Sequence, residues 1–413
     1  MDPYPRWQEK RIQQALASRR VLILAGARQC GKTTLAKTLS TSDTIYRTLD
    51  DVTLLEAALN DPHGFVRHGH QLMIIDEVQR APLLLQAVKK NVDETQTPGR
   101  FLLTGSANIQ SLPGVTESLA GRVRKIRLRP LAMGEIHRTL PHFIEQAFDG
   151  YFDASAPSSD KEAYVQDAFR GGFPEAIRLH TEKERHLWHQ DYLEALMERD
   201  LKDIAQIRRQ DSMLKLVQAL AAWSSKFMDI AGLCATLSLS RPTVESYINA
   251  LEALYVVERV ACWHKTDYDR VGKREKLFMT DTGLMAAILR WRFDTVYLDG
   301  SLNGKLLETF VFNQLMALIE SQDEAYTLFH YRDREQREID FLVENEEGVL
   351  IGIEVKAGSS VTTAAFNHMR WFRESIATHR PFTGIVLYTG EHVVPFGDGL
   401  WAIPIRCLWG AKA

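Results

Sequence analysis

The sequence predicts an α/β fold made of several domains. Short apolar runs alternate with helical patterns over residues 1–140, which is typical of a parallel sheet flanked by helices. A glycine-rich loop follows the apolar run at residues 21–24, and two acidic residues follow the run at residues 72–75. Residues 338–343 and 349–356 predict a second pair of strands with charged side chains. We therefore expect an N-terminal α/β domain and a separate C-terminal α/β domain.

Length and composition agree with a multidomain globular protein. The 413 residues correspond to two or three domains of about 150 residues each. A formal net charge of −3 provides no overall attraction to nucleic acid, so any DNA binding would depend on local basic patches. One candidate is the stretch 122–129, in which basic and apolar residues interleave, and the alternative is the solvated face of an ordinary strand. The four cysteines form no C-x-x-C pair, which argues against a zinc site or a disulfide framework. Neither a signal peptide nor an apolar stretch of about 18 residues is evident, so we expect a cytoplasmic protein without a membrane partner.

The glycine-rich loop matches the P-loop pattern. Gly26-Ala27-Arg28-Gln29-Cys30-Gly31-Lys32-Thr33 fits G-x-x-x-x-G-K-[ST] and lies between an apolar run and a helical segment. Glycines let the backbone bend around the β-phosphate of a nucleotide, so that N–H groups point at its oxygens. The lysine would contact the β- and γ-phosphates, and the first threonine would ligate Mg²⁺. The expected ATP-binding residues are Gly26, Gly31, Lys32, Thr33 and Thr34, with Thr33 also a metal ligand.

Two carboxylates follow the apolar run that ends at residue 75. Parallel sheets present the carboxyl ends of their strands to a ligand, so Asp76 and Glu77 are expected near the P-loop. Asp76 would hold Mg²⁺ through water, and Glu77 would orient or deprotonate the attacking water. Together with the P-loop, this pair predicts an ATPase.

A third apolar run, at residues 101–103, ends in Thr104-Gly105-Ser106. Here the chain resembles the AAA+ ATPases, in which a polar residue at this strand end senses the γ-phosphate or positions the water. The resemblance implies this role for Thr104 first and for Ser106 second. Residues 118–121 predict the end of a helix, and by the same resemblance Arg122 is the candidate arginine finger. The alternative for Arg122 is an ordinary solvated side chain in the basic stretch 122–129.

The middle of the chain predicts helices and then a winged helix-turn-helix. A long helical run extends over residues 182–207, and two short helices separated by a turn follow at residues 227–233 and 242–254. The second short helix carries Glu245, Asn249 and Glu252, with Arg241 only at its start. Because this face does not favour phosphates, a packing or subunit-contact role is preferred over duplex binding.

The C-terminal strands bring charged residues to one point. Glu354 and Lys356 alternate along one strand and share a face, and Asp340 begins the preceding strand. Glu308 lies on an earlier helix and can complete the cluster. The arrangement resembles the PD-(D/E)XK, or restriction-endonuclease-like, nucleases, with Ile339 where the name-giving motif has proline. The resemblance implies that Asp340 and Glu354 bind Mg²⁺, that Glu308 supports the metal or a water, and that Lys356 positions or activates the nucleophile.

The whole chain resembles a prokaryotic group of AAA+ ATPases with a C-terminal domain of formerly unknown function. The further motifs that carry this resemblance are Gly171-Gly172-Phe173-Pro174, Glu198-Arg199-Asp200-Leu201 and Asp281-Thr282-Gly283-Leu284. The expected domains are an AAA+ core at 1–140, a helical lid or linker at 141–211, a winged helix-turn-helix at 212–270 and a nuclease-like domain at 271–413. The resemblance implies an ATP-driven protein, a hexamer by preference, that remodels or moves duplex, forked or branched DNA and cuts it with an Mg²⁺-dependent nuclease. The alternative is a nucleotide-dependent switch or scaffold whose nuclease fold is silent and binds a protein or DNA partner.

Overall fold

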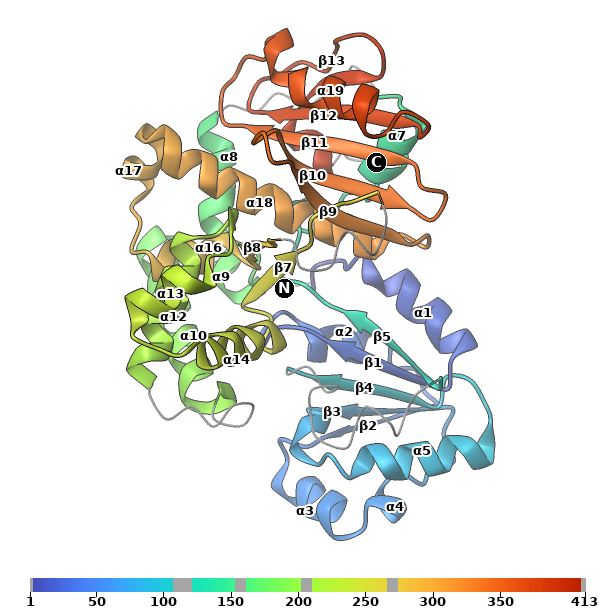
Figure 1. Ribbon diagram of the computed structural model, residues 1–413. Coiled ribbons are helices and arrows are strands. Elements are labelled where there is room, and N and C mark those ends of the chain that lie inside the picture. The colour runs from blue at the N-terminus through green and yellow to red at the C-terminus, as the bar shows by residue number, and fades with distance from the viewer. Residues whose placement is uncertain (1–2, 107–120, 153–160, 202–209, 266–273, 410–413) are drawn as a thin grey trace. The chain divides into compact units, whose positions relative to one another are not determined.

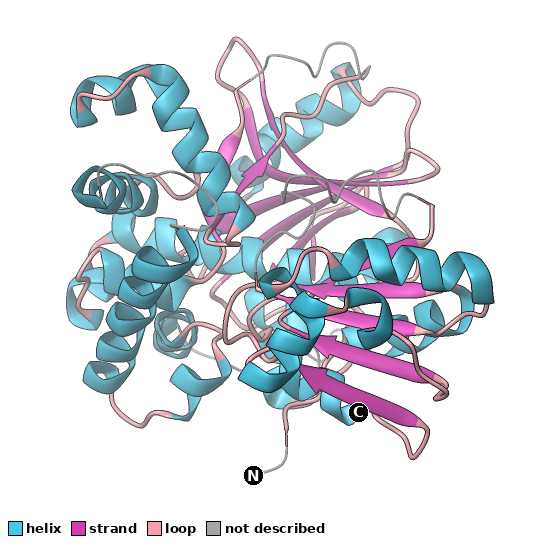
Figure 2. Cartoon of the chain, turned by 90° about the horizontal axis from the view of Figure 1, so that it is seen from below, coloured by secondary structure: helices cyan, strands magenta, loops and turns pink. Residues whose placement is uncertain are grey.

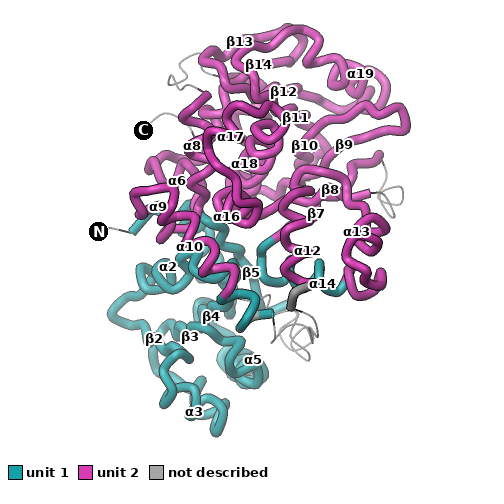
Figure 3. Tube along the Cα trace, turned by 90° about the vertical axis from the view of Figure 1, so that its left-hand side faces the viewer, with its two compact units in different colours: residues 1–130, 195–208, 246–256 teal, residues 131–194, 209–245, 257–413 magenta. Residues whose placement is uncertain are grey.

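The computed structural model describes residues 3–106, 121–152, 161–201, 210–265 and 274–409. The chain divides into two compact units, and each unit is assembled from three stretches of sequence (Figure 3). Unit 1 contains residues 1–130, 195–208 and 246–256, and unit 2 contains residues 131–194, 209–245 and 257–413. The four-part division expected from the sequence stays a prediction. The helix predicted to end near residue 121 falls on 107–120, and part of the helical run to residue 207 falls on 202–209, so both lie outside the described residues.

Unit 1 is built on a five-stranded parallel sheet of order β2-β3-β4-β1-β5 (Figure 1). Its strands are β1 (Val21–Ala25), β2 (Thr44–Thr48), β3 (Leu72–Asp76), β4 (Phe101–Gly105) and β5 (Val123–Arg127). The three central strands are buried at every position, which explains their continuous apolar runs, whereas β2 and β5 form the half-buried edges. The predicted parallel α/β sheet is therefore confirmed.

Short helices connect these strands. They are α1 (Gln8–Ser18), α2 (Lys32–Thr38), α3 (Val52–Asn60), α4 (Pro62–Phe65), the 3₁₀ turn η1 (Val78–Arg80) and α5 (Leu84–Thr95). Asp51 caps α3 by accepting a hydrogen bond from the Leu54 N–H at 2.9 Å. Helix α2 begins at Lys32, directly after Gly31, so its N-terminus faces the P-loop.

The N-terminal part of unit 2 is mainly helical. Figure 2 distinguishes the helices of the chain from its strands. Its helices are α6 (Met133–His137), α7 (Phe143–Asp149), α8 (Lys161–Arg170), α9 (Pro174–Arg178), α10 (Glu182–Ala195) and α12 (Gln210–Ala222), and α16 (Thr282–Ile288) and α17 (Phe293–Leu298) follow later in the same unit. The π-helical turn η3 (Leu196–Asp200), directly after α10, belongs to unit 1. Asp281 is buried here and accepts hydrogen bonds from the N–H groups of Gly172 at 2.6 Å and Leu284 at 2.7 Å. Two of the sequence motifs thus meet at one aspartate, which gives them a structural role.

The winged helix-turn-helix stays a prediction, and its region contains short helices and strands. They are α13 (Ile230–Leu237), α14 (Arg241–Ala253) and the strands β6 (Lys226–Phe227), β7 (Val257–Val260) and β8 (Lys276–Met279), which form an antiparallel sheet of order β6-β8-β7. Arg241 Nε donates to Glu245 Oε1 at 2.8 Å, one turn along the same helix. The arginine at the start of α14 is therefore already paired with an acidic neighbour.

A mixed six-stranded sheet forms the C-terminal part of unit 2. It has the order β13-β14-β12-β11-β10-β9, with β9 to β11 antiparallel and β11, β12 and β14 parallel. The elements are the long helix α18 (Gly300–Ser321), β9 (Tyr326–Arg332), β10 (Glu338–Asn345), β11 (Leu350–Lys356), the 3₁₀ turn η4 (Thr363–Phe366), α19 (Asn367–Ser375), β12 (Phe382–Tyr388), β13 (Val394–Pro395), β14 (Leu400–Pro404) and the 3₁₀ turn η5 (Ile405–Trp409). Side chains of β10 to β12, β14 and α19 form a shared apolar core that includes Ile339, Leu342, Val386 and Phe372.

Residues 131–152 pack into the same unit as this sheet. The Met133 N–H donates to Gln314 of α18 at 2.8 Å, and the rings of Phe152 and Trp401 of β14 meet edge to face at 5.5 Å. Among the described residues, no helix is long and apolar enough to cross a membrane.

Candidate functional site

The P-loop of unit 1 folds around the ammonium group of its own lysine. Lys32 Nζ donates to the carbonyl oxygens of Gly26 at 3.0 Å and Ala27 at 2.7 Å, and the side chain is buried. Gly31 has a φ of 101°, a left-handed conformation that favours glycine. A Cβ on Gly26 would overlap the Leu128 carbonyl oxygen. Both glycines are therefore required by the backbone path, as the sequence pattern predicted.

Asp76 is the centre of a polar cluster at the carboxyl edge of the sheet. Its two oxygens lie 3.0 and 3.2 Å from Thr33 Oγ1, and the Thr104 hydroxyl also donates to it. Thr33 lies 43 positions before Asp76, and Thr104 lies 28 positions after it. Both reach the same carboxylate because the carboxyl ends of parallel strands meet at one edge of the sheet. Hydroxyl and carboxylate oxygens are the ligands that Mg²⁺ prefers, so Thr33 and Asp76 fit the metal of a bound nucleotide.

Sequence reasoning missed Tyr46, which also binds Asp76. The Tyr46 hydroxyl, from β2, donates to Asp76 Oδ2 at 2.8 Å. Burial, together with the hydrogen bond to Asp76 and its charge, raises the pKa of Tyr46 and keeps the phenol protonated as a donor. A tyrosine in a strand is usually a packing residue, and only the pairing of β2 beside β3 shows that this one faces the carboxylate.

Glu77 leaves the strand in a left-handed turn and is held from two sides. Its φ is 57°, and its N–H donates to Thr104 Oγ1 at 3.3 Å. Its carboxylate accepts a hydrogen bond from Gln79 Nε2, which also lies 3.1 Å from Ser106 Oγ. Both polar residues predicted at the end of β4 therefore contact the acidic pair, Thr104 directly and Ser106 through a glutamine. Thr34, also predicted to bind nucleotide, lies exposed on the first turn of α2.

Arg122 lies at the opposite edge of the sheet from the P-loop of its own chain. It precedes β5, whose first residue Val123 pairs with Val21, whereas the P-loop follows the last residue of β1. Five residues of strand separate the two edges, or about 16 Å. Arg122 Nε forms an ion pair with Asp93 of α5. The residue therefore faces away from the nucleotide site of its own subunit.

The basic stretch that follows Arg122 packs against an aromatic ring. Lys125 Nζ lies 5.7 Å and the Arg127 guanidinium 4.8 Å from the centroid of Tyr255. This contact favours the ordinary structural interpretation of the stretch over a DNA-binding surface.

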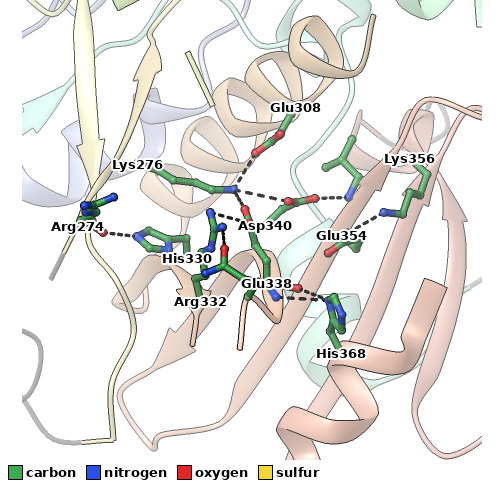
Figure 4. Close-up of polar contacts among 12 residues, drawn as sticks. Arg274, Lys276, Glu308, His330, Arg332, Glu338, Asp340, Glu354, Lys356 and His368 are labelled. Carbon is green, nitrogen blue, oxygen red and sulfur yellow. Dashed lines mark hydrogen bonds and ion pairs between the residues drawn. The ribbon is translucent and has the colours of Figure 1, made fainter. Parts of the chain in front are cut away.

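The structure brings together the four charged residues predicted in the C-terminal domain (Figure 4). Glu308 comes from α18, Asp340 from β10, and Glu354 and Lys356 from β11. Lys356 Nζ donates to Glu354 Oε1 at 2.7 Å, and the Val355 N–H donates to Asp340 Oδ2 at 2.9 Å. The pleat of paired antiparallel strands and the packing of α18 on β11 explain this convergence.

A second lysine, which sequence reasoning missed, lies among these carboxylates. Lys276 of β8 is 1% exposed, and its Nζ lies 2.6 Å from Glu338, 3.1 Å from Glu308 and 3.6 Å from Asp340 (Figure 4). Glu338 was also missed as a member of the cluster, although it shares a strand face with Asp340. Lys276 has no distinctive signal in the sequence, because it is the last of four consecutive charged residues, 273–276, before the apolar run Leu277-Phe278-Met279.

The surroundings of the cluster shift the pKa values of Lys276, Glu308 and Glu354. Burial alone would lower the pKa of Lys276, but the three carboxylates outweigh it and the pKa is raised. Burial and then the charge of Asp340 raise the pKa of Glu308 to about 8 and that of Glu354 to about 7. Burial and the crowding of the carboxylates thus both favour the protonated forms of Glu308 and Glu354.

The C-terminal cluster does not fit a bound Mg²⁺. Across the described ranges, no three Asp, Glu, His or Cys side chains are placed to hold a metal ion together. The point shared by Glu308, Glu338 and Asp340 is taken by the Lys276 ammonium.

Comparison with known proteins agrees with the geometry of unit 1. Residues 18–137 match the family described as AAA domain, whereas residues 161–295 and 303–408 each match a domain of unknown function (DUF8612 and DUF4143). Uncharacterized proteins of Mycobacterium bovis and Mycobacterium tuberculosis are 28% identical over 400 residues, which cover 95% of this chain and 82% of each relative. The structure of AMPPCP-bound DnaA from Aquifex aeolicus is similar with a TM-score of 0.29 and 12% identity, covering 59% of this chain and 86% of DnaA.

The P-loop, the acidic pair and the family match together define the class of the N-terminal part. It is an AAA+ ATPase domain. With a TM-score below 0.5, the similarity to DnaA does not define the function of the chain.

Proposed function

We propose that the chain is an ATP-dependent DNA-processing protein whose AAA+ domain binds and hydrolyses ATP. The observation that carries the ATPase part is the junction at Asp76, which joins the P-loop Thr33 to Tyr46 of β2 and Thr104 of β4. Each of these residues comes from a different strand or helix of the same α/β domain, so the cluster forms only when the domain is folded.

The residues at this junction and beside it would each have a separate role in hydrolysis. Lys32, now bonded to the carbonyl oxygens of its own loop, would turn to the β- and γ-phosphates when a nucleotide enters. Thr33 and Asp76 would hold Mg²⁺, which neutralises phosphate charge when bound. Glu77 would accept a proton from the attacking water, with Thr104 holding the start of its turn.

Arg122 supports a proposal of assembly. Because it lies at the edge of the sheet away from the P-loop of its own chain, it can serve as an arginine finger only for a neighbouring subunit. We therefore propose a ring of subunits, with a hexamer preferred by resemblance to AAA+ proteins. Asp93 would hold Arg122 until the neighbour is bound.

The C-terminal domain supports two candidate functions. The order of α18, the antiparallel strands β9 to β11, α19 and the parallel strand β12 supports a restriction-endonuclease-like fold, with Asp340, Glu354 and Lys356 at one point. An Mg²⁺-dependent endonuclease would need a divalent cation where Lys276 now lies. That observation favours the second candidate, a nucleotide-dependent switch or scaffold whose nuclease fold binds DNA or protein without cutting.

One assay separates these functions. ATP hydrolysis and cleavage of labelled single-stranded, duplex, forked and four-way DNA would be measured with and without Mg²⁺ and ATP, for wild type, Asp340→Ala and Glu77→Gln. DNA-stimulated hydrolysis that is lost in Glu77→Gln, without cleavage, supports the ATPase with a silent nuclease fold. Mg²⁺-dependent cleavage that is lost in Asp340→Ala establishes the nuclease. Absence of both hydrolysis and cleavage would refute the DNA-processing proposal.

A further inference from the structure

We propose that Lys276 is the resident cation of the C-terminal carboxylate cluster and that it takes the place of a divalent metal there. The inference rests on the second candidate function, because it explains why a nuclease-like fold would be silent. It extends that function by assigning the lack of nuclease activity to Lys276, which is not one of the predicted site residues.

The position of the ammonium group is the first support. Lys276 Nζ contacts oxygens of Glu338 at 2.6 Å, Glu308 at 3.1 Å and, more distantly, Asp340 at 3.6 Å. These carboxylates come from α18 and β10, so the ammonium lies where separate elements converge, as a shared metal ion would. A lysine offers three N–H donors, and Glu338 and Glu308 lie within hydrogen-bond distance of them. Its positive charge would repel a divalent cation at the same point.

The remaining carboxylate oxygens also have partners. Glu354 accepts a hydrogen bond from Lys356, and Asp340 Oδ2 accepts one from the Val355 N–H. Mg²⁺ exchanges its hydration shell only for well-placed, charged oxygens, so these contacts further weaken the case for a metal.

The charges of the cluster are nearly balanced without a metal. Glu338 is shared between Lys276 and Arg332, whose Nη1 lies 3.6 Å from it. Three cations, Lys276, Lys356 and Arg332, thus face the four carboxylates of Glu308, Glu338, Asp340 and Glu354. A site without excess negative charge has little affinity for a divalent cation.

The backbone of Lys276 holds the ammonium in place. Lys276 lies in the middle strand of the sheet β6-β8-β7, where it pairs with Phe227 on one side and Val260 on the other. Its ammonium also lies 5.5 Å from the centroid of the Phe227 ring. A side chain 1% exposed and anchored in a central strand cannot leave the cluster by a simple rotation into solvent.

Manganese binding tests the proposal directly. Free Mn²⁺ would be measured by electron paramagnetic resonance during titration of the nucleotide-free full chain, for wild type, Asp340→Asn, Lys276→Met and the double variant. Lys305→Met is the matched control, because Lys305 lies on α18 one turn before Glu308 but donates to the Ala222 carbonyl oxygen and not to the cluster. We expect wild type, Asp340→Asn and Lys305→Met to bind equal amounts of Mn²⁺. Lys276→Met should gain one further site, which Asp340→Asn removes.

Two results would overturn the proposal. One is loss of bound Mn²⁺ when Asp340→Asn is introduced into wild type, since this would show a metal already in the cluster. The other is a folded Lys276→Met chain that gains no site. If Lys276→Met does not fold, the comparison of wild type with Asp340→Asn still decides, because a resident metal would be lost and a resident lysine would leave Mn²⁺ binding unchanged. This readout needs neither ATP hydrolysis nor DNA cleavage, so it is independent of the assay for the proposed function.

Discussion

Replacement of Lys276 by methionine should destabilise unit 2 strongly. Methionine has a similar length but no charge, so Glu308, Glu338 and Asp340 would lose the ammonium that lies 2.6 to 3.6 Å from their oxygens. Removal of one partner from a buried ion pair costs about 3–5 kcal/mol, because the remaining charge is left buried and uncompensated. Protonation of the carboxylates limits this cost, so we place the loss at about 3 kcal/mol. A domain stability of about 5–15 kcal/mol leaves the variant folded.

Urea unfolding followed by tryptophan fluorescence measures this loss. Trp263 is buried in the core of unit 2 and reports on its unfolding. Lys356→Met is the control, since its pair with Glu354 is 43% exposed on the lysine side and should contribute less than about 1 kcal/mol. A loss below about 1 kcal/mol for Lys276→Met, or equal losses for both variants, would refute the assignment of Lys276 as the cation that holds the cluster together.

Three further predictions concern other residues. Arg122→Ala should reduce ATP turnover by about 10³-fold and leave ATP binding nearly intact, whereas Asp93→Ala should not reduce turnover; equal loss of turnover and binding in Arg122→Ala would contradict the finger assignment. Tyr46→Phe removes one hydrogen bond to Asp76 and should lower turnover by about tenfold with an unchanged ATP affinity, as steady-state kinetics and nucleotide titration would show; an unchanged turnover would exclude a positioning role. The pKa of Glu308 is raised from 4.5 to about 8, so the unfolded chain loses this proton first and the free energy of unfolding should fall as pH rises between these values. Glu308→Gln should make this decrease smaller, while the raised pKa of Glu354 sustains part of it, and an unchanged decrease between pH 5 and pH 9 in urea unfolding would contradict the reasoning.

The sequence alone predicted the parallel sheet and its nucleotide site well. The apolar runs at β1, β3 and β4 indicated buried parallel strands, and the P-loop pattern located Lys32 and Thr33. Such local signals are strong because each run is bounded by residues with defined backbone or ligand roles. Tyr46 was not predicted, because its role depends on the pairing of β2 with β3. A local sequence pattern does not determine the order of strands in a sheet.

The C-terminal site was predicted in part. Alternation along two strands correctly brought Glu354 and Lys356 to one face, near Asp340 and Glu308 (Figure 4). Lys276 escaped prediction because it belongs to a different sheet, 32 residues before Glu308, and reaches the cluster only through tertiary packing.

The chemical types of the functional side chains were determined by the sequence: a phosphate-binding loop, an acidic pair and a second group of carboxylates with a lysine. The tertiary structure decided which of these groups face one another. Asp76 gains three hydroxyl partners from separate elements, whereas the C-terminal carboxylates gain a buried ammonium. The physical reason is that charge compensation in a buried site depends on distances of about 3 Å between residues far apart in the chain. Only the packing of the elements sets those distances.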